Sequence, residues 1–154
     1  MDDGIGNLYG NKVRVRVCGI CWQNNDLLLV NHRGLTAGDF WAPPGGGLEF
    51  GESVEQCLRK EFMEETGLEI TIGRFQFACE FVHKPLHAIE LFFEVAGDGG
   101  QLTKGDDPEM PIIDDVRFMA PDEITKISPS NLHGIFSLLQ MPEDLKTLTG
   151  FFRI

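Results

Sequence analysis

Basic residues are scarce in this sequence. It has 13 lysine and arginine residues against 24 aspartate and glutamate residues, which gives a formal net charge of −11 at pH 7. Double-stranded nucleic acid is bound through many contacts between basic side chains and phosphates, and an acidic chain offers no broad basic face for them. We therefore expect no duplex nucleic acid partner. An anionic phosphate can still bind where a metal ion and a few cations reverse the local field.

Long apolar runs are also missing. No segment approaches the roughly 18 consecutive apolar residues of a membrane-spanning helix, and the N-terminal MDDGIGNLYG lacks a signal-peptide pattern. We therefore expect a cytoplasmic protein with no membrane partner. The 154 residues, 42% of them hydrophobic, are predicted to form a single domain over 1–154.

Cysteines are few, and two of the four, Cys18 and Cys21, form a CxxC pair. A zinc site would need a second close pair, and a redox motif would stand at the N-terminus of a helix. This pair instead continues an alternating run from Val13 to Val17 that predicts a strand, so the two side chains point to opposite faces. We therefore expect four reduced, structural cysteines.

Several motifs that bind phosphates or metals are absent. The chain contains neither a G-x-x-x-x-G-K-[ST] phosphate loop nor a G-x-G-x-x-G motif, and its acidic segment at 106–109 does not follow the EF-hand pattern. His83 and His87 have the spacing of a helical metal pair, but Pro85 between them prevents that helix. We assign no chemistry to any of the four histidines.

What the sequence does contain is a strand-rich pattern with one central helix. Strands are predicted over Val13–Trp22, Leu27–Val30, Ile70–Val82, His87–Val95 and Ile112–Ala120, with turns at 43–47 and 98–100 and a C-terminal tail, Thr149–Ile154, that pairs with a sheet edge. Helices are predicted from Ser53 to Thr66, from Pro121, and over Asn131–Leu139. Ser53 is a favourable N-cap, and Gly67 ends the central helix. This order predicts a mixed β-sheet between helices.

The central helix carries three glutamates, Glu61, Glu64 and Glu65. Offsets of three and four residues place them on one face of the helix, where their like charges repel unless a cation neutralises them. Oxygen ligands suit a hard divalent ion such as Mg²⁺ or Mn²⁺, and the glycines at 45–47 let backbone approach the same place. Acidic helix faces are usually only solvated, and three glutamates alone would favour that interpretation.

A longer pattern decides between the two interpretations. The motif G-x5-E-x7-R-E-U-x-E-E-x-G-U, in which U is a bulky apolar residue, falls on Gly46, Glu52, Lys60, Glu61, Phe62, Glu64, Glu65, Gly67 and Leu68. The sequence from Trp41 to Leu68 therefore resembles the Nudix hydrolase family. One position differs, because Lys60 stands where the family has arginine. The resemblance implies an α/β fold, the Nudix-type α/β/α sandwich with a mixed β-sheet.

The resemblance also implies an activity. Members of the Nudix family are hydrolases that depend on Mg²⁺, which Mn²⁺ can replace. They cleave the pyrophosphate linkage of a small-molecule phosphate anhydride. We expect a nucleoside diphosphate derivative, such as an NTP or a nucleotide sugar, as the substrate. The alternative is a Nudix-fold nucleotide-binding or regulatory module with little turnover, and Lys60 is the feature that favours this alternative.

Site residues follow from the same resemblance. Metal ligands are expected at the Gly45 carbonyl, Glu61, Glu64 and Glu65, with Glu109 of the acidic segment as a further candidate. Glu61 or Glu64, or a carboxylate outside the signature, could take the proton from the attacking water. Glu52 is expected to support the helix start, and Lys60 to pair with helix carboxylates and orient them. Arg33 and Gly46 are candidate contacts for the substrate.

Overall fold

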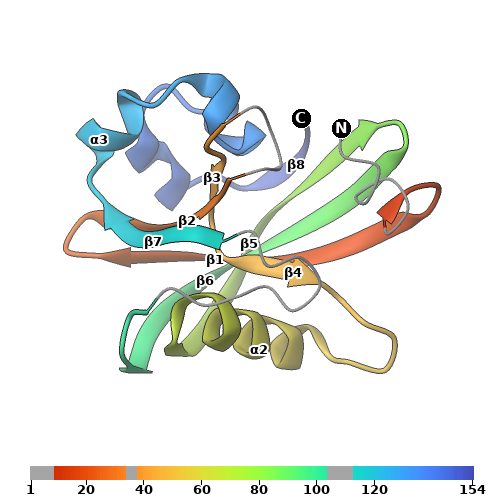
Figure 1. The fold of residues 1–154 in the computed structure, drawn as a ribbon, viewed down its shortest axis with the longest axis horizontal. Helices are drawn as coiled ribbons and strands as arrows, with labels where there is room; N and C mark the ends of the chain where they lie inside the picture. The colour runs from red at the N-terminus through yellow and green to blue at the C-terminus, as the bar shows by residue number, and fades with distance from the viewer. Residues whose placement is uncertain (1–8, 34–37, 104–112) are drawn as a thin grey trace.

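The computed structural model describes residues 9–33, 38–103 and 113–154 (Figure 1). Its elements, in chain order, are β1 (Val13–Gln23), β2 (Asp26–His32), β3 (Trp41–Ala42), β4 (Gly45–Gly47), α2 (Val54–Thr66), β5 (Leu68–His83), β6 (Leu86–Gly100), β7 (Ile113–Met119), α3 (Pro121–Thr125), the 3₁₀ helices η1 (Pro129–Asn131), η2 (Gly134–Leu138) and η3 (Pro142–Lys146), and β8 (Gly150–Arg153). None of the described helices is long and apolar enough to cross a membrane.

The strands form one mixed sheet in the order β3-β2-β1-β6-β5-β8, with β4 added to β1 and β7 added to β2. β1 runs parallel to β6 but antiparallel to β2 and β4. β5 and β6 form a long antiparallel hairpin. The mixed β-sheet expected from the sequence is confirmed.

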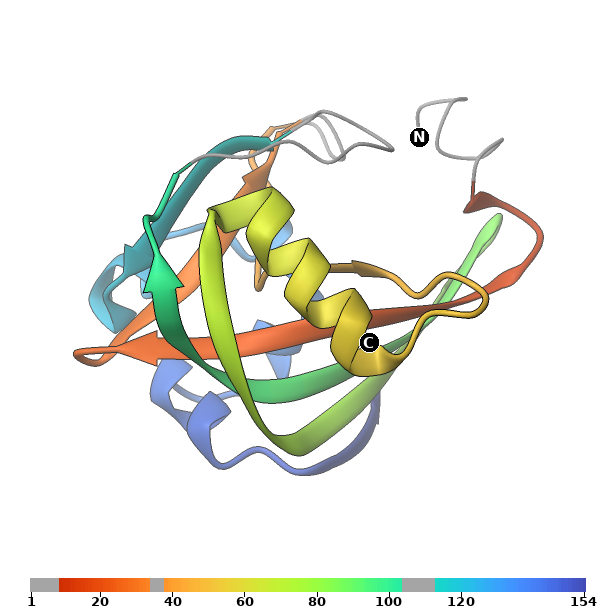
Figure 2. The same cartoon turned by 90° about the horizontal axis from the view of Figure 1, so that it is seen from below.

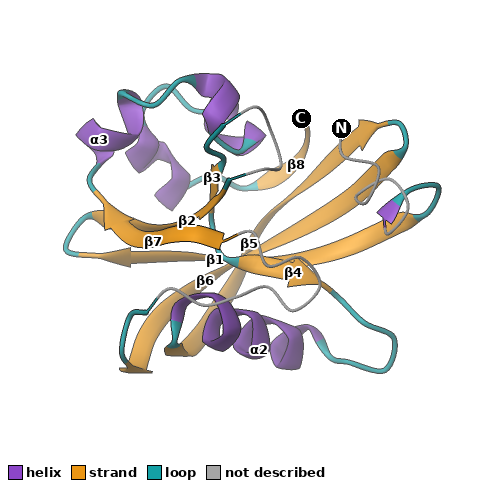
Figure 3. Cartoon of the chain, viewed as in Figure 1, coloured by secondary structure: helices purple, strands orange, loops and turns teal. Residues whose placement is uncertain are grey.

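Helices cover the two faces of this sheet (Figures 1 and 3). α2 lies on one face, and α3 with the C-terminal 3₁₀ helices lies on the other; the view from below shows α2 crossing the long strands (Figure 2). Alternate residues of β1 supply both cores: Val17 and Cys21 pack with Leu58 and Phe62 of α2, whereas Cys18 and Ile20 pack with Ile124 and Ile135. Burying each large apolar side chain stabilises the fold by roughly 1.5–3 kcal/mol, so the core holds α2 firmly on the sheet.

The ends of α2 agree with the sequence. The Ser53 side chain accepts a hydrogen bond from Gln56 N, and the Gln56 side chain accepts one from Ser53 N, which completes a capping box. Gly67 ends the helix with φ at 75°, a left-handed conformation that costs glycine little. The helix therefore begins and ends where it was predicted.

Three local predictions are wrong. The expected turn at 98–100 belongs to β6, because Gly99 and Gly100 pair with the start of β5. The glycines at 45–47 form strand β4, paired with β1, instead of a turn. The helix expected over Asn131–Leu139 is split into η1 and η2, because the extended chain at Leu132 and His133 pairs with Trp41.

The predictions for the tail and the cysteines are confirmed. β8 pairs in parallel with the edge of β5. All four cysteines are buried and reduced, and Cys18 and Cys21 belong to opposite cores.

Candidate active site

α2 presents its glutamates toward the glycine strand β4. Leu58 and Phe62 face the core, and this orientation brings Glu61 and Glu65, each three residues after one of them, against the sheet. Glu61 is 8% exposed and Glu65 is fully buried, whereas Glu64 is partly exposed. Carboxylates buried this deeply are stable only beside hydrogen-bond donors or cations, so the groups around them decide what the site can hold.

The two oxygens of Glu65 lie near two different strands. Oε1 accepts a hydrogen bond of 2.9 Å from Gly45 N, and Oε2 lies 3.6 Å from His32 Nε2 at the end of β2. Burial above all, and then the charge of Arg16, lowers the pKa of His32 to about 4, so this imidazole is neutral at pH 7. The carboxylate of Glu65 is therefore fixed between β2 and β4.

Glu61 depends on the absence of a side chain at position 46. A Cβ built on Gly46 would lie 2.3 Å from the carboxyl carbon of Glu61 and 2.5 Å from its Oε2. Only glycine lets this carboxylate lie flat against the backbone of β4. The structure thus places Gly46, an expected substrate contact, directly against an expected metal ligand.

The donor chemistry fits Mg²⁺. Glu61, Glu65 and the backbone of Gly45 bring only oxygen ligands to one place, as a hard divalent ion prefers. Within the described ranges, no group of three or more His, Cys, Asp or Glu side chains is arranged as a metal cage. Mg²⁺ does not need one, because it usually binds one or two carboxylates and completes its shell with water and substrate phosphates.

Lys60 contacts a carboxylate that precedes the helix. Its Nζ lies 2.7 Å from Glu52 Oε2 and 3.9 Å from Glu49 Oε2. The hydrogen bond between Lys60 and Glu52 lowers the pKa of Glu52 and raises that of Lys60. Glu52 also accepts a hydrogen bond of 3.3 Å from Glu49 N. Lys60 and Glu52 therefore tie the loop between β4 and α2 to the helix.

Two predicted residues remain, Arg33 and Glu109. Arg33 is bonded to Asp39, with Nη2 2.9 Å and Nε 3.0 Å from Oδ1, and its side chain is 59% exposed. The structure thus places Arg33 in a surface ion pair. Glu109 lies outside the described residues, and its role remains a prediction.

Sequence reasoning missed a buried polar chain beside this site. Arg16 Nη1 lies 3.1 Å from Glu90 Oε2, and Glu90 Oε1 lies 2.8 Å from His133 Nε2. Arg16 Nη2 lies 3.5 Å from the carbonyl oxygen of Gly45. The only signal in the sequence was Arg16 itself, a charged residue within a predicted strand. Its partner Glu90 could not be predicted without the register between β1 and β6.

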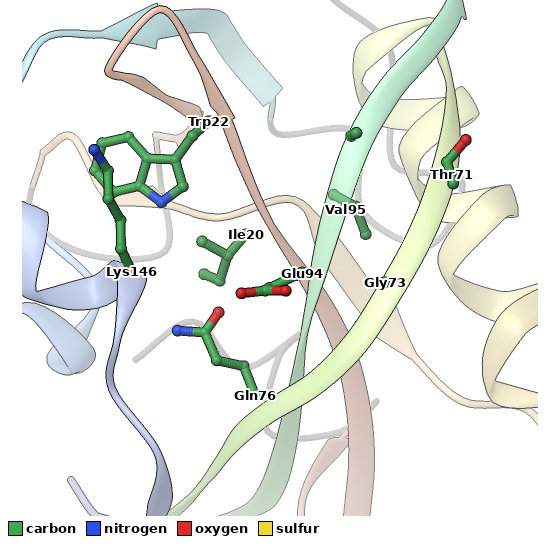
Figure 4. Close-up of a pocket in the computed structure, with 9 residues that line it drawn as sticks. Ile20, Trp22, Thr71, Gly73, Gln76, Glu94, Val95 and Lys146 are labelled. Atoms are coloured by element: carbon green, nitrogen blue, oxygen red, sulfur yellow. The ribbon is translucent and has the colours of Figure 1, made fainter.

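A separate cavity of about 350 Å³ lies near the C-terminal end of β1 (Figure 4). Trp22, Gln76, Glu94 and Lys146 are among its lining residues, and the signature glutamates are not. Its buried polar atoms, Trp22 Nε1 and Gln76 Oε1, are covered from solvent, so a ligand cannot reach them without a rearrangement. The cavity is not part of the glutamate site.

Comparison with known proteins agrees with this geometry. A family model described as NUDIX domain matches residues 11–136. An ADP-ribose pyrophosphatase of Methanocaldococcus jannaschii is 34% identical over 98 residues, which are 60% of this chain and 56% of that protein. A nucleoside triphosphatase NudI of an Enterobacter species is 46% identical over 65 residues, 39% of this chain and 45% of that protein. The chain thus spans about half the length of these curated relatives.

A solved structure shares the fold. A NUDIX hydrolase from Nitrosomonas europaea superposes with a TM-score of 0.66 at 20% identity, over 88% of this chain and 86% of that one. At this identity the likeness describes the arrangement of strands and helices.

Proposed function

The chain belongs to the Nudix family, and from that premise we propose that it is a Mg²⁺-dependent hydrolase that cleaves the pyrophosphate linkage of a nucleoside diphosphate derivative. The observation that carries the proposal is the contact between two buried helix glutamates and the glycine strand. Glu65 accepts a hydrogen bond from Gly45 N, and Glu61 lies against Gly46. These contacts support a site made of oxygen ligands on a rigid helix and a strand.

Each residue then has a task. Glu61, Glu64 and Glu65, with the Gly45 carbonyl, would hold the ion, and the buried positions of Glu61 and Glu65 limit how far these two carboxylates move. A bound Mg²⁺ supplies charge neutralisation at the phosphates and acidifies water. Glu61 or Glu64 would accept the proton of the attacking water, and Glu64 is the less buried of the two residues. Lys60 and Glu52 hold the loop that connects β4 to α2.

A binding or regulatory module with little turnover is the second candidate. It is favoured by Lys60, because lysine lacks the planar fork with which arginine holds a carboxylate. Against it, Lys60 forms a contact of 2.7 Å with Glu52 and so retains the charge pairing. The enzyme is therefore the better supported of the two.

The test is a screen of nucleoside diphosphate derivatives with Mg²⁺, in which phosphate is measured after treatment with a phosphatase. The names of the relatives suggest ADP-ribose and nucleoside triphosphates as the first substrates. We expect Glu64→Gln and Glu65→Gln each to lower turnover by at least about a hundredfold, because each weakens the metal site. Stability should hold or rise, because a repelling charge is removed.

The matched control is Glu55→Gln, an exposed glutamate of the same helix that pairs with Arg59. It should leave turnover unchanged. A folded parent protein that hydrolyses none of the compounds would favour the binding module. Glutamine variants that melt far earlier than the parent would show that these glutamates are structural.

A further inference from the structure

Arg16 lies where β4 and β6 flank β1. It faces Gly47 in the β1–β4 pair and Glu90 in the β1–β6 pair. Residues opposite each other in neighbouring strands point to the same face of the sheet, so the guanidinium reaches Glu90 at 3.1 Å. Its other end, Nη2, lies 3.5 Å from the Gly45 carbonyl. Arg16 therefore extends from the interior of the sheet to an expected metal ligand.

Glu90 is fixed by its neighbours. It is buried, and Oε1 accepts a hydrogen bond of 2.8 Å from His133 Nε2. His133 Nδ1 accepts a bond from Ile135 N at 3.1 Å, so the ring proton is on Nε2 and the imidazole donates it to Glu90. The Cys18 thiol lies 3.9 Å from Oε2. With both oxygens engaged, Glu90 serves to hold Arg16.

Arg16 keeps donors for a ligand. Its side chain is 27% exposed, compared with 4% for that of Glu90. A guanidinium has five N–H donors in a planar fork, and the contacts with Glu90 and the Gly45 carbonyl occupy two of them. The nearby acids Glu90, Glu65 and Glu61 favour its positive charge. The result is a cation held at the edge of an acidic site.

We propose that Arg16 contacts a non-bridging phosphate oxygen of the substrate diphosphate, and that Glu90 and His133 are positioning residues that hold its guanidinium in place. The inference rests on the proposed function, because the phosphate in question is the one that a metal ion at Gly45 would bring there. Arginine suits the task because its fork binds phosphate oxygens in pairs. A preorganised cation at this place also stabilises the charge that develops during cleavage.

A buried ion pair that only stabilises the sheet is the competing explanation. Such a pair would need Glu90 alone, whereas Arg16 also reaches Gly45 and solvent. Removing the arginine entirely would leave Glu90 buried without its cation, which threatens folding. Arg16→Lys is the better variant, because it keeps the charge and loses the fork.

The experiment compares binding of α,β-methylene-ADP with Mg²⁺, by calorimetry, with binding of Mn²⁺ alone, by electron paramagnetic resonance. We expect Arg16→Lys to weaken analogue binding about tenfold, because bidentate contact is lost, and to change Mn²⁺ affinity less than about twofold, because the charge is kept. Arg74→Lys is the matched control, since Arg74 also pairs with a glutamate of β6, Glu94, but at the surface. It should leave both affinities unchanged.

The positioning role has its own variants. His133→Phe removes the donor to Glu90 and should weaken analogue binding about fivefold, whereas His133→Gln keeps an N–H donor and should restore most of the affinity. Equal analogue affinity in Arg16→Lys and in the parent would overturn the role of Arg16. If the parent nevertheless hydrolyses a substrate, the proposed function stands. A parent that binds neither Mn²⁺ nor the analogue contradicts both proposals.

Discussion

At the scale of single residues, the site depends on a glycine that makes room for a charge. Gly46 has no side chain, and the carboxylate of Glu61 occupies the space in which its Cβ would lie. A backbone that approaches a carboxylate this closely can also approach a phosphate. Glycine is therefore needed at position 46 because of the neighbouring carboxylate, and not because the backbone turns there.

We expect Gly46→Ala to displace Glu61 and to lower turnover at least about tenfold, with a loss of roughly 1–3 kcal/mol in the free energy of unfolding, as is typical of overpacking. Gly97→Ala in β6 is the matched control, because a Cβ there meets nothing within 4 Å. Turnover and urea unfolding measure the two effects. An alanine variant at position 46 as active as the parent would show that Glu61 does not need its present position.

The pKa of Glu90 makes the stability of the fold depend on pH. Burial raises the pKa of this carboxyl, but its interactions with His133 and Arg16 outweigh burial and lower the pKa from 4.5 to about 2. A carboxyl whose pKa is depressed in the folded state stabilises the fold above its unfolded value, and this contribution is lost as the pH falls from 4.5 towards 2.

We therefore expect the difference in unfolding free energy between the parent and Glu90→Gln to be largest near pH 7. It should shrink by roughly 1 kcal/mol on going to pH 4, because protonation then stabilises the unfolded parent. Urea unfolding at several pH values measures the difference. Glu94→Gln, on the same strand but with a side chain that is 42% exposed, serves as control. A difference independent of pH would mean that the Glu90 pKa is not depressed.

At the scale of elements, the site depends on how α2 is joined to β4. Packing of Leu58 and Phe62 sets the rotation of the helix, and its capping box sets where it begins. Lys60 reaches back to Glu52 in the preceding loop. Core packing, the capping box and this ion pair therefore fix the position of the helix relative to the loop and the sheet.

We expect Lys60→Arg to keep or raise the hydrolytic rate, because arginine can hold Glu52 with two parallel bonds. Lys60→Ala should lower the rate about tenfold by releasing the loop. Glu52→Gln, combined with Lys60→Ala, should add little to the single change, since coupled residues are non-additive. Rate measurements on Lys60→Arg, Lys60→Ala, Glu52→Gln alone and the double variant test this. Additive losses, or a Lys60→Ala variant as fast as the parent, would exclude the shared role.

At the scale of the whole molecule, sequence patterns predicted what depends on local chemistry. The caps and length of α2, the hairpin strands and the opposite burial of Cys18 and Cys21 follow from periodicity and from Ser53 and Gly67. The helix expected over Asn131–Leu139 does not form, because Leu132 and His133 pair with Trp41, which is distant in sequence, and this pairing overrides the local helix propensity.

The parts of the site that could not be predicted depend on strand register. Glu90 is 74 residues from Arg16, and His133 is a further 43 residues away. His32 reaches Glu65 only because β2 ends beside β4. No spacing in the sequence predicts these contacts. Nothing in the sequence distinguishes His32 and His133, which lie beside the site, from the other two histidines. The glutamates could be found because helical periodicity and the signature both placed them.

The most direct test of the central claim is a crystal structure of the protein soaked in Mn²⁺, with anomalous diffraction used to locate the ion. We expect anomalous density among the carboxylates of Glu61, Glu64 and Glu65 and beside the Gly45 carbonyl. We also expect this density to be lost in Glu65→Gln crystals grown under the same conditions. Ordered Mn²⁺ elsewhere on the molecule, with no density among these oxygens, would show that the glutamates do not hold the metal.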